Sequence, residues 1–356
     1  MSFSLEQLRL PIVLAPMAGG PSTPALAAAV GNAGGLGFLA AGYKSVETLR
    51  EDIEQLRLAS PEPFGVNLFA RPKRRGDREQ VRRYADSLQG EAERYGAKLG
   101  EPRFDDDGYD AKLALLLQGS VAVVSFTFGC PSPAEVAGLH AADASVWVTV
   151  TSVEEASRAQ RAGADAVIAQ GIEAGGHRAC FDDGAPAEEL GLLALLRQLA
   201  RDCALPVVAT GGIMDGAAIA ASRCAGAAAV QLGSALMLTP EAGTSAPQRT
   251  ALATPAPTGL TRAFSGRLAR GIVNRFMLEH DVSAPRAYPE VHHLTTPIRA
   301  AARAAGDAQG FNLWAGQGHA LARAAPAAQI VKDLDAEARR VLASQRAFIP
   351  GSQEQR

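Results

Sequence analysis

The stretch VIAQGIEAGGHRACF holds the residues of this chain whose types and spacing could do chemistry. A short apolar run ends in a pair of glycines, and His177 and Arg178 follow directly. An imidazole whose ordinary pKa is about 6.5 can donate a hydrogen bond to an anion or remove a proton from a neutral substrate. The alternative is a turn residue whose ring is bonded to the backbone. The pattern marks His177 as a candidate catalytic residue and leaves Arg178 unassigned.

Two glycine loops follow later apolar runs, in the segments ATGGI (residues 209–213) and QLGSA (residues 231–235). Glycine lets backbone N–H groups approach a phosphate closely, and the Ser234 hydroxyl adds a donor. One such loop is also an ordinary turn before a helix. Two of them at consecutive strand ends predict a phosphate site that includes Gly212 and Gly233.

Polar amides stand at the ends of three apolar runs, namely Asn67, Gln170 and Gln231. Amide donors and acceptors around an otherwise apolar mouth suit the edge of an isoalloxazine ring. No HxH, HExxH or carboxylate cluster predicts a metal site, and no GxSxG elbow predicts a serine nucleophile. We expect His292 and His293 to lie on an extended segment with a surface or capping role.

Short apolar runs recur along the chain and predict eight buried strands. They are residues 11–17, 36–40, 64–69, 121–128, 145–150, 165–171, 205–212 and 226–234. Helical stretches separate them, and one begins at a capping box made by Ser152 and Glu155. A charged stretch from about residue 71 to residue 119 is expected to form the solvated faces of helices.

This alternation predicts an α/β fold, a TIM (β/α)8 barrel that gathers the glycine loops and His177 at one mouth. A doubly wound sheet is the alternative, but the cluster NAGGLGFLAAG lacks the GxGxxG spacing and precedes a strand. We expect residues 1–252 to form the barrel and residues 253–356 to form a C-terminal extension near its mouth. The extension is too short for a core of its own and is expected to end in a helix over 327–343.

Composition narrows the class of protein. The 356 residues are 47% hydrophobic and 20% charged, with a net charge of −2, which predicts a folded protein without affinity for nucleic acid or acidic membranes. No apolar run of about 18 residues predicts a membrane span, and no secretory signal is readable. The cysteines show no paired framework and predict reduced thiols in a cytoplasmic protein, with Cys180 a spectator. They are Cys130, Cys180, Cys203 and Cys224.

Several motifs together resemble class I nitronate monooxygenases, a family formerly called 2-nitropropane dioxygenases. They are PIVLAPMAGGPSTPALAAAVGNAGGLGFLAAGY, FGVNLF, VSFTFG, AQGIEAGGHR, VVATGGI, VQLGSA and NLWAGQG. The resemblance implies a barrel with FMN that oxidises alkyl nitronates such as propionate 3-nitronate with O2, giving a carbonyl compound and nitrite without reduced nicotinamide. Its partners would be a small-molecule nitronate and O2, and the protein would be a monomer or homodimer.

The resemblance also implies roles for individual residues. His177 would face the substrate. Met17, Asn67, Gln170 and Gly175 would lie at the flavin, and Gly212, Gln231, Leu232, Gly233 and Ser234 would hold the ribityl phosphate. Two departures stand out: Ser234 replaces the usual threonine, and Ala179–Cys180 follow GGHR where glycine is common.

Two other functions stay open. An FMN-dependent NAD(P)H reductase of quinones or enoyl thioesters would use the same barrel and cofactor, and NAD(P)H would reduce its flavin without O2. A non-catalytic flavin- or phosphate-binding module would hold the cofactor without turnover.

Overall fold

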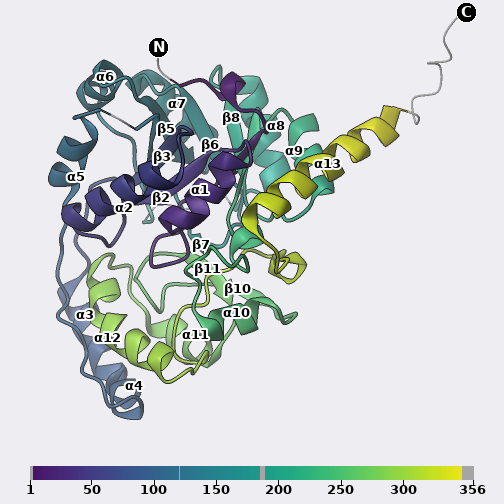
Figure 1. The fold of residues 1–356 in the computed structure, drawn as a ribbon. Helices are drawn as coiled ribbons and strands as arrows, with labels where there is room; N and C mark the ends of the chain where they lie inside the picture. The colour runs from purple at the N-terminus through teal and green to yellow at the C-terminus, as the bar shows by residue number, and fades with distance from the viewer. Residues whose placement is uncertain (1–2, 120, 185–188, 347–356) are drawn as a thin grey trace, which may run out of the picture.

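Eight parallel strands form the centre of the molecule (Figure 1). The computed structural model describes residues 3–119, 121–184 and 189–346. The strands are β1 Ile12–Leu14, β2 Gly37–Ala40, β3 Phe64–Phe69, β4 Val123–Thr127, β5 Ser145–Val150, β6 Ala166–Gln170, β8 Val207–Thr210 and β9 Ala229–Leu232. Their order is β1-β9-β8-β6-β5-β4-β3-β2, and a parallel bridge between Val13 and Leu36 joins the two ends. The predicted TIM (β/α)8 barrel is confirmed.

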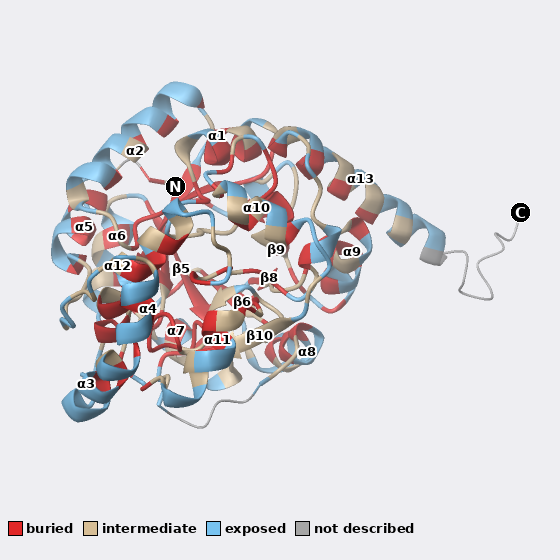
Figure 2. Cartoon of the chain, turned by 90° about the horizontal axis from the view of Figure 1, so that it is seen from below, coloured by how far each residue is buried: buried red, intermediate tan, exposed pale blue. Residues whose placement is uncertain are grey.

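Helices cover the outside of this barrel, and their inner faces are buried while their outer faces are exposed (Figure 2). They are α1 Pro24–Asn32, α2 Val46–Ala59, α5 Tyr109–Leu116, α6 Pro133–Ala141, α7 Val153–Ala162, α8 Leu192–Asp202, α9 Gly216–Cys224 and α13 Ala327–Arg346. The last of them, α13, packs against α9 and α1. The end of the chain therefore completes the helical ring, and the division at residue 252 stays a prediction.

The predicted elements differ from the observed ones mainly at their ends. Strand β1 stops at Leu14, and residues 15–17 line the cavity instead. Ser152 caps α7 as predicted, but the capping box does not form. The Glu155 carboxylate instead accepts from the N–H groups of Thr151 at 2.6 Å and Phe181 at 2.5 Å. It ties the loop after β6 to the end of β5.

A second layer covers the mouth of the barrel. It contains α3 Arg78–Ser87, α4 Gln89–Arg94, α10 Ala246–Leu252, α11 Arg275–His280, α12 Glu290–Ala304 and a small antiparallel sheet of β7 Gly176–His177, β10 Thr258–Thr261 and β11 Ala269–Ile272. Tyr84 of α3, Phe264, Phe276 and Ile298 form a buried apolar cluster there. Helices α3 and α4 of the charged stretch contribute Val81, Tyr84, Leu88 and Ala92 to this cluster, so the extension does not form it alone.

No helix in the described part of the chain is long and apolar enough to cross a membrane. The four cysteines are free thiols, as predicted.

Candidate active site

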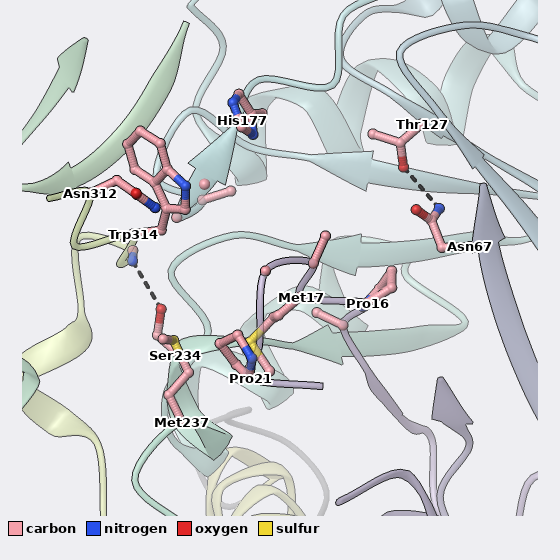
Figure 3. Close-up of a pocket in the computed structure, with 18 of the residues that line it drawn as sticks. Pro16, Met17, Pro21, Asn67, Thr127, His177, Ser234, Met237, Asn312 and Trp314 are labelled. Atoms are coloured by element: carbon pink, nitrogen blue, oxygen red, sulfur yellow. Dashed lines mark hydrogen bonds between the residues drawn. The ribbon is translucent and has the colours of Figure 1, made fainter. Parts of the chain in front are cut away.

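A cavity of about 420 Å³ lies at the carboxyl ends of the barrel strands. The loops after β1, β6, β8 and β9 line it together with α12 and residues 312–316. Figure 3 shows Trp314 and Asn312 entering from the C-terminal segment, and Asn67 and Thr127 from barrel strands. The volume suits a small-molecule site, and TIM barrels carry their active sites at this end.

His177 lines this cavity from the short strand β7. Pairing of His177 with Ala269 of β11 fixes its backbone, and its Nε2 lies 2.8 Å from the Ser265 hydroxyl. Three aromatic rings surround the imidazole, with centroid distances of 5.8 Å to Phe128, 5.8 Å to Tyr288 and 5.4 Å to Trp314. The side chain is therefore held from several sides.

Its surroundings also decide the charge of His177. Burial lowers the pKa of His177 to about 3, and the positive charges of Arg267 and Arg299 add to this effect. Desolvation disfavours the charged form of an imidazole, and nearby cations disfavour it further. The ring is therefore neutral near pH 7 and can hold or accept a proton but supplies no positive charge to the site.

Gly175 has no room for a side chain. A Cβ placed there would lie 2.5 Å from both the carbonyl carbon of Ala315 and the backbone nitrogen of Gly316. The loop that carries His177 and the C-terminal segment thus touch through their backbones at this point. A glycine in the GGHR motif is required by this contact.

Gln170 uses its amide to hold the same loop. Its Nε2 donates to the carbonyl of His177 at 3.1 Å, and its Oε1 accepts from the N–H of Ala179 at 2.9 Å. Arg178 lies buried behind the loop, where Nη1 donates to the carbonyl of Gln170 at 2.6 Å. Gln170 lines the cavity, as expected of a flavin contact, but its polar atoms already position His177.

Two other amides of the cavity wall, Asn67 and Gln231, have polar atoms without a hydrogen-bond partner among the described residues. The Nδ2 of Asn67 donates to the hydroxyls of Ser125 and Thr127, both at 2.9 Å, and no described residue donates to its Oδ1. The Nε2 of Gln231 is buried and has no acceptor among the described residues. A buried donor without a partner costs about 1–3 kcal/mol, so a bound ligand that accepts from Gln231 would remove a real penalty.

The two glycine loops meet at the other end of the cavity. Gly211 and Gly212 have φ values of +119° and +69°, a backbone region that favours glycine. The N–H of Gly212 has no acceptor among the described residues, and the Ser234 hydroxyl accepts from the N–H of Gly316 at 2.9 Å. The proton of the Ser234 hydroxyl is free to be donated, which suits a phosphate oxygen.

The structure corrects the expectation for His292 and His293. Both residues lie on α12, not on an extended segment, because the whole stretch from Glu290 to Ala304 is helical. His292 lines the cavity and stacks on the ring of Tyr43 with a centroid distance of 4.1 Å. His293 lies outside the cavity, with Nε2 2.9 Å from a carboxylate oxygen of Asp105.

The structure brings most of the predicted site residues together. His177 and eight of the nine predicted cofactor residues line the cavity: Met17, Asn67, Gln170, Gly175, Gly212, Gln231, Gly233 and Ser234. Leu232 does not, since its side chain is in the barrel core. Sequence reasoning missed further lining residues, namely Tyr43, Phe128, Ser265, His292, Arg299, Arg303, Asn312 and Trp314. Only the spacing of Thr296, Arg299 and Arg303 on one helical face could have indicated some of them.

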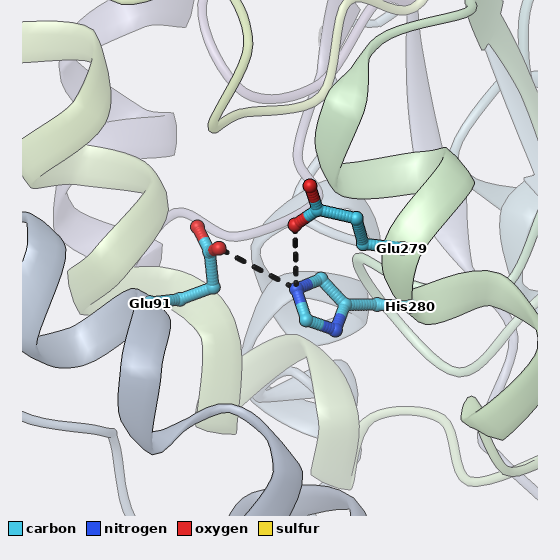
Figure 4. Close-up of side chains that lie close together, drawn as sticks. All are labelled: Glu91, Glu279 and His280. Carbon is cyan, nitrogen blue, oxygen red and sulfur yellow. Dashed lines mark ion pairs between the residues drawn. The ribbon is translucent and has the colours of Figure 1, made fainter.

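One carboxylate cluster lies outside the cavity. Glu91 of α4 and Glu279 and His280 of α11 come close enough to hold a cation (Figure 4). Arg275 already occupies this position, with its guanidinium 2.7 Å from Glu91 and 2.6 Å from Glu279. The cluster therefore joins α4 to α11 as an ion-pair network.

Comparison with known proteins identifies the family. The nitronate monooxygenase family model matches residues 4–337. The chain is 42% identical over 347 residues to a nitronate monooxygenase of Paraburkholderia phytofirmans, covering 95% of this chain and 94% of that protein. The chain belongs to the nitronate monooxygenase family.

A second relative and a solved structure agree with this membership. The nitronate monooxygenase of Pseudomonas aeruginosa is 43% identical over 348 residues, covering 93% of this chain and 97% of that protein. A nitroalkane oxidase from Streptomyces ansochromogenes superposes with a TM-score of 0.92 and 51% identity, covering 96% of this chain and 99% of that one. The predicted family is confirmed, and the nitronate monooxygenase family consists of flavoenzymes.

Proposed function

We propose that the chain oxidises alkyl nitronates with O2 and that its products include a carbonyl compound and nitrite. The observation that carries this proposal is the neutral, firmly held His177 in an aromatic part of the cavity. Phe128, Tyr288 and Trp314 surround the imidazole and limit the access of water. Family membership supports oxidation of a nitro compound there.

The cofactor of this proposal is FMN, and the residues of the cavity fit it. Asn67 Oδ1 and the unpartnered Gln231 Nε2 would meet the polar edge of the flavin ring, with Met17 and Gly175 beside the ring. The N–H of Gly212 and the hydroxyl of Ser234 would hold the phosphate. When bound, FMN would supply one-electron oxidation and reactivity toward O2.

His177 and Ser265 would together remove the α-proton of a neutral nitroalkane. The Ser265 hydroxyl lies 3.2 Å from the carbonyl of Arg267, to which it can donate, so His177 Nε2 would donate to Ser265. In that arrangement Nδ1 carries the lone pair, and no described residue is hydrogen-bonded to it. Nδ1 would then remove the α-proton of a neutral nitroalkane, whereas a preformed nitronate needs no base.

The proposal is tested by mixing the purified protein with propionate 3-nitronate and O2 while nitrite is measured. A parallel sample receives NADPH without O2 while the flavin absorbance is followed. Nitrite in the first sample and an unchanged flavin in the second are expected. Bleaching of the flavin by NADPH without nitrite formation would favour the NAD(P)H reductase. A yellow protein with neither reaction would favour a binding module.

A cytoplasmic location and a monomeric or homodimeric state stay predictions.

A further inference from the structure

Two arginines of α12 face the cavity on the same side of the helix. Arg299 and Arg303 lie one turn apart, and both line the cavity together with Thr296 and Ala300. Residues three and four apart share a helical face, so these side chains form one surface. This arginine surface faces no acidic residue, because no aspartate or glutamate of the described part of the chain lines the cavity.

The charge of Arg299 is not balanced by a carboxylate. Its side chain is buried, and none of the hydrogen-bond partners of its guanidinium is a carboxylate. The partners are Thr295 Oγ1 at 2.9 Å, Asn312 Oδ1 at 2.9 Å, the carbonyl of His292 at 3.0 Å, Thr296 Oγ1 at 2.9 Å and the ring Nδ1 of His292 at 3.3 Å. Burial lowers the pKa of Arg299 to about 10, so the group keeps its proton near pH 7.

Arg303 is less restrained. Its guanidinium lies over the ring of Phe311, with 4.9 Å to the centroid, and it forms no ion pair with a described residue. Other arginines of the chain do have acidic partners, as Arg275 has Glu91 and Arg323 has Glu337. A buried cation without a counter-ion is costly. The buried Arg299 and the half-buried Arg303, side by side at one cavity without a carboxylate, therefore indicate an anionic ligand.

The position of the pair separates this anion from the cofactor phosphate. Residues 312–316 run along the cavity. Every second residue of this segment, namely Asn312, Trp314 and Gly316, contacts a different part of the site. Asn312 accepts from Arg299, the Trp314 ring contacts His177, and the N–H of Gly316 donates to Ser234. Four residues of extended chain span about 13 Å, so Arg299, which donates to Asn312, lies well away from Gly316 and the phosphate end.

We propose that Arg299 and Arg303 form a subsite for a carboxylate of the substrate, a few bonds from the carbon that reacts beside His177. This inference rests on the proposed function and narrows its substrate class to nitronates of carboxylic acids. Arg303 contacts the carboxylate, since its donors are uncommitted, and Arg299 adds charge from a fixed position. Because His177 is neutral, these guanidinium groups supply the positive charge of the substrate site.

The test compares propionate 3-nitronate with propyl-1-nitronate, which has a methyl group in place of the carboxylate. In Arg303→Gln, the ratio of kcat/KM for the first substrate to kcat/KM for the second should fall about 10- to 100-fold, through KM. Arg303→Lys should recover part of the ratio because it keeps the charge. The matched control is Arg340→Gln on the exposed side of α13, which should leave the ratio unchanged.

Two further measurements keep the outcomes distinct. The FMN affinity of Arg303→Gln should match that of the wild type, and a tenfold loss would assign the guanidinium to the cofactor phosphate and overturn the proposal. Succinate binding, measured by calorimetry on the flavin-loaded protein, should weaken at least tenfold in Arg303→Gln. Weaker succinate binding in Arg303→Gln would support the subsite even if the wild type forms no nitrite. The absence of nitrite would refute only the proposed function. An equal substrate ratio or equal succinate affinity in both proteins would overturn the subsite.

Discussion

At the scale of single residues, the neutral state of His177 decides what the site can do. An imidazole with a pKa of about 3 is a weak base, and it cannot act as the counter-ion of a nitronate. Its fixed position near three aromatic rings partly offsets the low basicity, because a positioned base avoids the cost of orientation. Proton removal and anion binding are therefore separate tasks, carried by His177 and by the arginines of α12.

We predict that His177→Asn loses about 100-fold in kcat/KM with neutral nitroalkanes and less than about tenfold with preformed nitronates. The expected loss is at the lower end of the range for general bases because the pKa of His177 is low. Initial rates of nitrite formation with nitroethane and with ethylnitronate provide the measurement. Equal losses on both substrates would mean that His177 is not the base.

The same pKa predicts a pH-dependent stability. The unfolded chain binds a proton on this histidine below about pH 6.5, whereas the folded protein binds it only near pH 3. Its contribution to the free energy of unfolding therefore falls as the pH drops through this window, by about 1.4 kcal/mol per pH unit. Urea unfolding of the wild type and His177→Asn between pH 4 and pH 7 should show this slope in their difference. A constant difference would contradict the low pKa.

At the scale of elements, the site depends on contacts between the loop after β6 and the C-terminal segment. Strand β7 pairs with β11, and the Nε of Arg270 donates to the carbonyl of Ile172 at 2.9 Å. The backbone at Gly175 meets the backbone at Ala315 and Gly316. The loop that carries His177 is therefore not held by the barrel alone.

We predict that Gly175→Ala lowers the free energy of unfolding by about 1 to 3 kcal/mol, because the new methyl group would push these backbones apart. The change should also weaken FMN binding, which flavin fluorescence measures. The matched control is Gly90→Ala in α4, where a Cβ would meet nothing within 4 Å. That substitution should stabilise the protein by about 0.5 to 1 kcal/mol. The same loss of stability in both variants would argue against a specific contact at Gly175.

At the scale of the whole molecule, the two ends of the chain complete each other's packing. Helix α13 packs against α9 and α1, and Ile330, Val331 and Leu334 belong to the main core of the barrel. The helical ring therefore closes only when the end of the chain has folded back past the extension. Folding of the barrel and placement of α12 over its mouth are coupled for this reason.

We predict that Leu334→Ala costs about 2 to 5 kcal/mol of stability, since the side chain is fully buried. Leu342→Ala, two turns further along the same helix, should cost less than about 1 kcal/mol because that side chain is exposed. Chemical denaturation of both variants provides the comparison. Similar costs for both would mean that α13 does not complete the core.

Much of the fold follows from local patterns in the chain. The predicted strands over 64–69 and 145–150 have the observed bounds, because a continuous apolar run between polar turns leaves little freedom in where a buried strand ends. Local patterns predict least where an element is defined by its tertiary contacts. Strand β7 has two residues and exists only through its pairing with β11. The helix that carries His292 lacks a side-chain cap and has Pro297 in its interior, so its local signals are poor.

The sequence alone determined the barrel, the family and the glycine loops, because each depends on residues that are near one another in the chain. The neutral state of His177 and the set of residues that line the site follow only from the tertiary structure. Burial and the distant Arg267 and Arg299 make His177 neutral, and Ser265 holds its ring. No spacing in the chain encodes these contacts, since they join a loop of the barrel to residues about 90 to 120 positions later. The distribution of charge in this site is a property of the folded chain.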